Sequence, residues 1–252
     1  MRVLSLFSGI GALDYGLQNA GFEIVGQCEI EEFPRRVLQK HWPNVPKFKD
    51  VQDVTAELVS ERCGRIDLIA GGFPCQDISV AGHGQGISGA RSGLYWQIHR
   101  LANEIQPAWL LLENVPALRT RGADEVLLSL AQIGYVAWPF VVGAWAIGAP
   151  HKRQRVWIVA YRDEIGWQAN SGVFDNKLGT EATRNWPGER LELGRGNSGR
   201  VRRIPNASLL RMDDGFASKL DADRVGALGN AVVPQIVEVI GRAILQAARR
   251  AA

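Results

Sequence analysis

The sequence predicts an α/β fold built on a doubly wound, mostly parallel β-sheet, because strand-like apolar runs alternate with helical patterns along most of the chain. The central runs are apolar almost throughout, as in a sheet that helices cover on both faces. The predicted strands are residues 3–7, 23–28, 66–70, 109–112, 135–142 and 156–161. The predicted helices are residues 12–20, 34–41, 94–106, 123–133 and 233–249.

Length and composition indicate a soluble, cytoplasmic protein. The 252 residues suffice for one large α/β domain, and the chain shows neither a signal peptide nor an apolar run of membrane-spanning length. Its three cysteines lie far apart without a C-x-x-C pair, which argues against a zinc site or a disulfide framework. A net charge of +3 permits a nucleic-acid partner without demanding one.

Residues 177–211 are locally basic, with eight Lys or Arg residues against three Glu. The same stretch is rich in Gly and Asn and lacks periodic apolar residues, which predicts an irregular insert rather than sheet and helix. Two interpretations stay open, a solvated linker and a surface that contacts phosphates.

The first predicted strand ends in Phe7-Ser8-Gly9-Ile10-Gly11, directly before a helix. Backbone amides and a helix N-terminus at that place form a nucleotide-type cradle, with a simple tight turn as the alternative. Asp14 stands where the dinucleotide fingerprint has its third glycine. Glu29 ends the second strand, where an acid can bind two ribose hydroxyls, and Asp50 in the next loop can accept from an adenine amino group. The alternative is that both acids cap a helix or turn.

Cys75 follows a predicted buried strand in Phe73-Pro74-Cys75-Gln76, after Gly71-Gly72. The carboxyl ends of strands carry the chemistry of open α/β sheets, so this thiol differs from an ordinary buried cysteine, which is how Cys28 and Cys63 are interpreted.

Glu113 ends the apolar run 109–112 in the triplet Glu113-Asn114-Val115. Partial desolvation there raises the pKa of the carboxyl and lets it hold a proton near neutral pH, with a capping acid as the alternative. Arg153 and Arg155 precede another apolar strand, and their two-residue spacing places both on one face of an extended chain.

Taken in order, F-S-G-I-G, an acid after the second strand, F-P-C-Q, E-N-V, R-x-R and Gly229-Asn230-Ala231-Val232 resemble the DNA cytosine-5 methyltransferases. The resemblance covers the chain apart from about residues 162–215. It implies a class I S-adenosylmethionine-dependent methyltransferase fold with a small irregular target-recognition region. The implied units are a catalytic and cofactor-binding domain at 1–161, a recognition region at 162–220, and a C-terminal segment with a returning helix at 221–252.

The resemblance also implies a reaction. Methyl transfer from S-adenosyl-L-methionine to carbon 5 of cytosine, leaving S-adenosyl-L-homocysteine, needs a nucleophile at carbon 6 of a flipped-out base in double-stranded DNA. Cys75 is the candidate nucleophile, and Glu113, Arg153 and Arg155 complete the catalytic set. The implied cofactor residues are Phe7, Ser8, Gly9, Ile10, Gly11, Glu29, Ile30, Asp50, Val51, Pro74, Leu94, Asn230 and Ala231. The implied DNA contacts are Gln76, Ser79, Arg91, His151, Arg200, Arg202 and Arg203.

His151 stands where the family more often has glutamine, and the recognition region is short, which favours a site of few bases. Two alternatives share the fold: a DNA-binding relative without activity and a methyltransferase acting on tRNA cytosine. A dehydrogenase is disfavoured because the third fingerprint glycine is missing. A single flipped base suits a monomer. The sequence is compatible with a partner restriction endonuclease and with an enzyme that acts alone.

Overall fold

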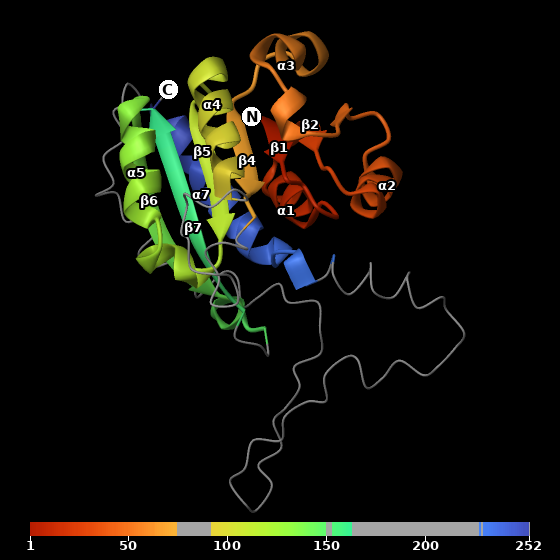
Figure 1. Ribbon diagram of the computed structural model, residues 1–252. Helices are drawn as coiled ribbons and strands as arrows, with labels where there is room; N and C mark the ends of the chain where they lie inside the picture. Colours follow the sequence, from red (N-terminus) through yellow and green to blue (C-terminus); the bar gives the residue numbers. More distant parts are fainter. Residues whose placement is uncertain (75–91, 150–152, 163–226, 228, 252) are drawn as a thin grey trace, which may run out of the picture.

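The computed structural model describes residues 1–74, 92–149, 153–162, 227 and 229–251. These residues form a seven-stranded sheet with helices on both faces (Figure 1). The strand order is β3-β2-β1-β4-β5-β7-β6. The strands are β1 (Arg2–Leu6), β2 (Glu23–Cys28), β3 (Lys47–Phe48), β4 (Leu68–Gly72), β5 (Trp109–Asn114), β6 (Tyr135–Gly143) and β7 (Gln154–Arg162).

Strands β1 to β5 pair in parallel, whereas β7 runs antiparallel to both of its neighbours, β5 and β6. The sheet is therefore mostly parallel and doubly wound, as predicted. Because β7 is inverted, its first residues lie at the same edge of the sheet as the last residues of β4 and β5. That edge is where open α/β sheets place their sites.

The helices form two layers. The α-helices are α1 (Ala12–Ala20), α2 (Glu32–His41), α3 (Ala56–Cys63), α4 (Tyr95–Ile105), α5 (Ala123–Gln132) and α7 (Pro234–Ala251). Short 3-10 helices are η1 (Val51–Asp53), η3 (Ser92–Leu94), η4 (Pro116–Thr120) and η5 (Ala144–Ile147). Helices α3, α4 and α5 cover one face of the sheet, and α1 and α7 cover the other.

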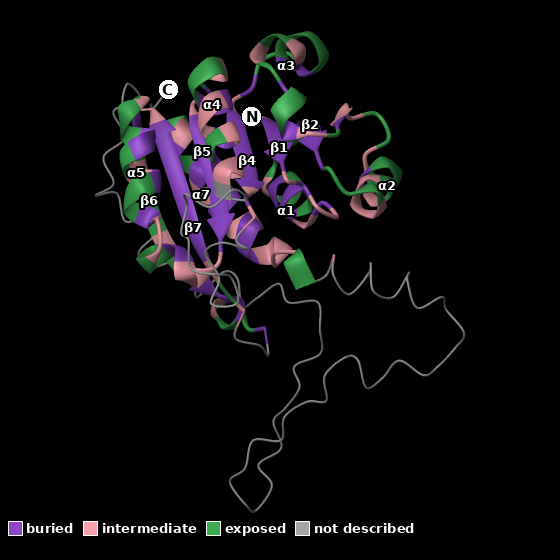
Figure 2. Ribbon diagram, viewed as in Figure 1, coloured by how far each residue is buried: buried purple, intermediate pink, exposed green. Residues whose placement is uncertain are grey.

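Alternation along the strands supplies both cores. In β1, Leu4 and Leu6 face the layer of α3, α4 and α5, whereas Val3 faces α1 and α7. Strand β5 is buried along its whole length, and β1 and β4 are buried except at one end (Figure 2), which explains why their residues are mostly apolar.

Helix α7 joins the N-terminal half of the sheet by packing on α1. Two small residues permit this close approach. A Cβ added to Gly16 would overlap Val237 and the backbone of Pro234, and one added to Gly241 would lie 2.8 Å from the Cβ of Ala20. The first half of α7 is thereby fixed beside α1. None of the described helices combines the length and the apolar character of a membrane span.

Candidate active site

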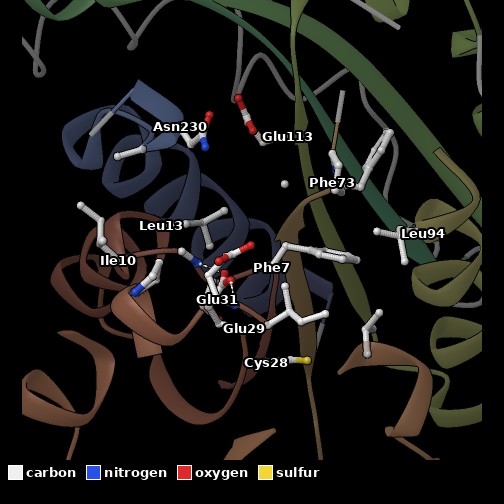
Figure 3. A pocket seen from close by; sticks show the side chains of 18 of the residues that line it. Phe7, Ile10, Leu13, Cys28, Glu29, Glu31, Phe73, Leu94, Glu113 and Asn230 are labelled. Atoms are coloured by element: carbon white, nitrogen blue, oxygen red, sulfur yellow. Dashed lines mark hydrogen bonds between the residues drawn. The ribbon is translucent and has the colours of Figure 1, made fainter. Parts of the chain in front are cut away.

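A cavity of about 460 Å³ opens at the edge of the sheet where β1, β2, β4 and β5 end (Figure 3). Most residues that the sequence assigned to a cofactor line it. They are Phe7, Ser8, Gly9, Ile10, Glu29, Ile30, Asp50, Val51, Pro74, Leu94, Asn230 and Ala231. Glu113 and Arg155 line the same cavity, so the structure brings the predicted nucleotide cradle and part of the predicted catalytic set together.

Gly11 is the predicted cofactor residue that does not line this cavity. Its φ is 83°, and a Cβ at this position would overlap the ring of Trp42. The glycine is therefore required by local packing at the start of α1.

The loop after β1 turns sharply, with positive φ at Phe7 (54°) and Gly9 (55°). The Ser8 hydroxyl, which is buried, donates to the carbonyl of Ser5 at 3.2 Å, and the Ser8 amide donates to the carbonyl of Cys28 at 3.0 Å. These bonds tie the loop to β1 and β2. Positive φ costs energy at a non-glycine residue, so Phe7 is strained, as residues at functional sites often are.

Glu29 connects two loops of the cavity wall. Its Oε2 accepts from the Gly9 amide at 2.7 Å, and its Oε1 accepts from the Glu31 amide at 2.8 Å. The residue is 8% exposed. Each carboxylate oxygen has two acceptor positions, so the fixed carboxylate retains capacity for hydroxyl donors of a ligand.

Asp50 has a structural role besides lining the cavity. Its Oδ1 accepts from the Gln52 amide at 2.9 Å and so caps the N-terminus of η1. The capping alternative raised by the sequence is thus realised for Asp50, which still reaches the cavity wall.

Glu113 lies at the end of β5, opposite Gly72 of β4. Its Oε1 is 2.7 Å from Nε of Arg155. Burial raises the pKa of Glu113 to about 7, although the positive charges of Arg155 and Arg153 lower it. The carboxyl therefore exchanges its proton near neutral pH, as the sequence predicted.

The two arginines of R-x-R have different partners. Arg155 pairs with Glu113, whereas Nη2 of Arg153 donates to the carbonyl of Gly229 at 2.7 Å. Arg153 does not line the cavity.

Asn114 has a structural role that its sequence motif does not reveal. Its Nδ2 donates to the carbonyl of Phe73 at 3.2 Å, and its Oδ1 accepts from the Val115 amide at 2.8 Å. The Phe73 ring packs against Tyr95, with centroids 5.3 Å apart. These contacts fix Phe73, two residues before Cys75 in the sequence.

Several other residues to which the sequence assigned no cofactor role also line the cavity. They include Leu13, Cys28, Glu31, Pro34, Gln52, Gly72 and Val115. Cys28 and Cys63 are buried, and burial raises the pKa of the Cys28 thiol to about 12, as befits unreactive core cysteines. The described residues contain no cluster of three His, Cys, Asp or Glu side chains that would hold a metal.

The remaining predicted site residues lie outside the described part of the chain. They are Cys75, Gln76, Ser79, Arg91, His151, Arg200, Arg202 and Arg203.

Comparison with known proteins identifies relatives of this chain. The family model described as C-5 cytosine-specific DNA methylase matches residues 1–223. The type II methyltransferase M2.BsuMI of Bacillus subtilis is 37% identical over 169 residues, which are 64% of this chain and 42% of that protein. The type II methyltransferase M.NgoBI of Neisseria gonorrhoeae is 32% identical over 168 residues, which are 65% of this chain and 51% of that protein. The alignments thus span about half the length of these relatives.

Among solved structures, a prophage-encoded protein of E. coli assigned as a DNA modification methyltransferase superposes with a TM-score of 0.59 at 29% identity. The superposition covers 69% of this chain and 50% of that one. The predicted methyltransferase-type fold is confirmed by this match.

Proposed function

Because this chain belongs to the C-5 cytosine-specific DNA methylase family, we propose that it transfers a methyl group from S-adenosyl-L-methionine to carbon 5 of cytosine in double-stranded DNA. The observation that carries the proposal is the position of the Glu113–Arg155 pair on the wall of the cavity that also contains the Gly9 loop and Glu29. One cavity thus combines a nucleotide-type cradle with an acid that titrates near neutrality.

The cavity fits the cofactor in size and chemistry. Its volume of about 460 Å³ lies in the range of small-molecule sites, and its apolar side chains include Phe7, Val51 and Leu94. Glu29 would accept from the ribose hydroxyls, since two loop amides hold its carboxylate in place. Asp50 would accept from the adenine amino group with the oxygen that does not cap η1. When bound, the cofactor supplies an electrophilic methyl group.

Cys75 acts as the nucleophile in the proposed reaction. Its thiolate adds to carbon 6 of cytosine, and the new carbon–sulfur bond pushes an electron pair through the ring toward nitrogen 3. Carbon 5 then becomes the nucleophilic end of an enamine. After methyl transfer, a base removes the proton from carbon 5, the carbon–sulfur bond breaks, and Cys75 leaves as the thiolate.

Glu113 stabilises the negative charge that this attack creates on the cytosine ring. In its protonated form it donates to nitrogen 3 and also accepts from the exocyclic amine. Arg155 holds the carboxyl by a 2.7 Å contact and is itself mostly buried, which limits the orientations that Glu113 can adopt. Burial supplies the raised pKa that keeps a proton on Glu113 near neutrality.

The proposed reaction also requires contacts to the DNA. Cytosine carbon 6 is inaccessible in a duplex, so the base must be flipped out, with Gln76, Ser79, Arg91 and His151 as the proposed contacts around it. Residues 162–220, between the catalytic domain at 1–161 and the returning segment at 221–252, are the proposed recognition region. If the basic residues of 177–211, including Arg200, Arg202 and Arg203, contact about five phosphates, log affinity falls with log salt at a slope of roughly −4 to −5.

Methyl transfer by the purified protein tests the proposal. Protein, S-adenosylmethionine with a labelled methyl group, and either mixed-sequence duplex DNA or tRNA are incubated, and the label in the nucleic acid is counted. We expect label in DNA that digestion releases as 5-methylcytosine. Label in tRNA alone would mean that the substrate is tRNA and not DNA. Cofactor binding without transfer to either nucleic acid would support the inactive DNA-binding alternative.

A further inference from the structure

We propose that Arg153 is a positioning residue that holds the segment 229–231 against the cofactor site, and so links the start of β7 to cofactor binding. The inference rests on the proposed function, because it assigns the cavity to S-adenosylmethionine. It separates Arg153 from Arg155, which the sequence had placed together in the catalytic set.

The contact joins distant parts of the chain. Nη2 of Arg153 lies 2.7 Å from the carbonyl oxygen of Gly229, 76 residues later in the sequence. The backbone of Arg153 is itself fixed, because its carbonyl accepts from the Ala144 amide at 2.9 Å. The guanidinium therefore extends from an anchored position on the sheet edge.

Within the part of the chain that the structure describes, residues 229–231 have few contacts besides the bond from Arg153. Gly229 and Asn230 are exposed, and Ala231 is half-buried. The Ala231 amide donates to the carbonyl of Ala227, a local contact within the same segment. After it, Val232 and Val233 pack against the core on the face of α1 and α7, and full burial begins at Ile236. Yet Asn230, Ala231 and Val232 all line the cavity, so a ligand there needs this segment to be ordered.

The pairing of Arg155 with Glu113 leaves Arg153 free for a different role. Arg155 occupies Oε1 of Glu113, which leaves Arg153 to bond a neutral carbonyl while its charge still acts on Glu113. A hydrogen bond from a charged donor contributes more than a neutral one and is directional. The guanidinium of Arg153 thus holds the cofactor-site segment through its bond to Gly229, and its positive charge lowers the pKa of Glu113.

Two substitutions distinguish the hydrogen bond to Gly229 from the positive charge of Arg153. Arg153→Met removes both, and Arg153→Lys keeps the charge but replaces the planar guanidinium with a shorter side chain that ends in one ammonium group. Arg162→Met is the matched control, since Arg162 lies at the other end of β7 and donates to Gln106 Oε1 at 2.7 Å, away from the cavity. The measurements are the Kd for S-adenosyl-L-homocysteine by calorimetry, the KM and kcat for cofactor, and the pH midpoint of the rate.

We expect Arg153→Met to raise Kd and cofactor KM about tenfold or more, with a smaller change in kcat. Its pH midpoint moves upward, because a cation that lowers the pKa of Glu113 is lost. Arg153→Lys restores the midpoint but only part of the affinity, and Arg162→Met matches the wild type. A melting curve establishes that each variant is folded, and Arg153→Gln serves if the Met variant is not.

Wild-type Kd in folded Arg153→Met would overturn the inference while leaving the proposed function intact. An equal loss of affinity in Arg162→Met would also overturn it, because the effect would then be general. Failure of the wild-type protein itself to bind the cofactor would overturn the proposed function and the inference together.

Discussion

Nε of Arg155 lies 2.7 Å from Oε1 of Glu113, and this contact joins the end of β5 to the start of the antiparallel strand β7. The two side chains are 19% and 11% exposed. Burial and the neighbouring cations act in opposite directions on the carboxyl, and burial prevails, so that the pKa of Glu113 is about 7. The inversion of β7 therefore has a chemical consequence, because it delivers an arginine to the edge where the parallel strands end.

The pH dependence of methyl transfer should show this acid. Deprotonation of Glu113 removes the donor to nitrogen 3, so the single-turnover rate should fall as pH rises through about 7. Glu113→Gln should slow transfer about 10²- to 10⁴-fold and abolish that falling limb. A falling limb that persists unchanged in the Gln variant would assign it to another group.

Gly72 and Gly71 offer a paired test of site against fold. A Cβ at Gly72 would lie 2.6 Å from Oε2 of Glu113, the end of a side chain, whereas one at Gly71 would lie 2.6 Å from the backbone oxygen of Leu6. Gly72→Ala should displace Glu113 and reduce methyl transfer with little change in melting temperature. Gly71→Ala should instead cost about 1 to 3 kcal/mol of stability. Full activity in Gly72→Ala would mean that the carboxyl position is not critical.

Asp14 should make stability depend on pH. It is fully buried, its Oδ2 accepts from Nε2 of Gln27 at 2.7 Å, and burial raises its pKa from 3.8 to about 6. The folded state thus binds the proton more tightly than the unfolded state, and stability is lost as pH rises from about 4 through about 6. The full loss is roughly 3 kcal/mol.

Asp14→Asn removes this titration while preserving an acceptor for Gln27. Unfolding in urea at several pH values should therefore show the wild type losing stability relative to the variant between pH 4 and pH 7. The other titratable groups are the same in both proteins, so their contributions cancel in the difference between the two free energies of unfolding. Parallel stability curves would show that Asp14 does not titrate in this range.

Cys75 should be required for turnover but not for cofactor binding. Cys75→Ser should abolish methyl transfer and leave the free energy of cofactor binding within about 1 kcal/mol, because the side chain acts on the base. Cys63→Ser, a change in the buried last turn of α3, is the control and should retain turnover. Turnover by Cys75→Ser would remove this residue as the nucleophile.

Regular patterns predicted most of the fold. The ranges of α1 and β2 agree with the structure to the residue, since Gly11 and Gly21 flank the helix and Glu29 follows the strand. One strand and one α-helix of the described residues were missed. Strand β3 has only two residues, too few for a visible alternation, and α3 is a short helix whose buried residues are limited to Val59 and Cys63.

Site residues could be predicted where a polar side chain directly follows a predicted strand. Glu29 and Glu113 were found in this way, Asp50 was found in the loop that follows, and all three line the cavity. Contacts between distant segments were not predictable. The bond between Arg153 and Gly229 depends on how the last helix packs, and nothing in the R-x-R spacing distinguishes it from the pair that Arg155 makes.

The most direct test of the central claim is bisulfite sequencing of the DNA of a host that lacks cytosine methylation and expresses this protein. The account predicts protected cytosines in a fixed short context, which disappear when Cys75→Ser is expressed instead. A folded, cofactor-binding protein that leaves every cytosine unprotected would contradict it.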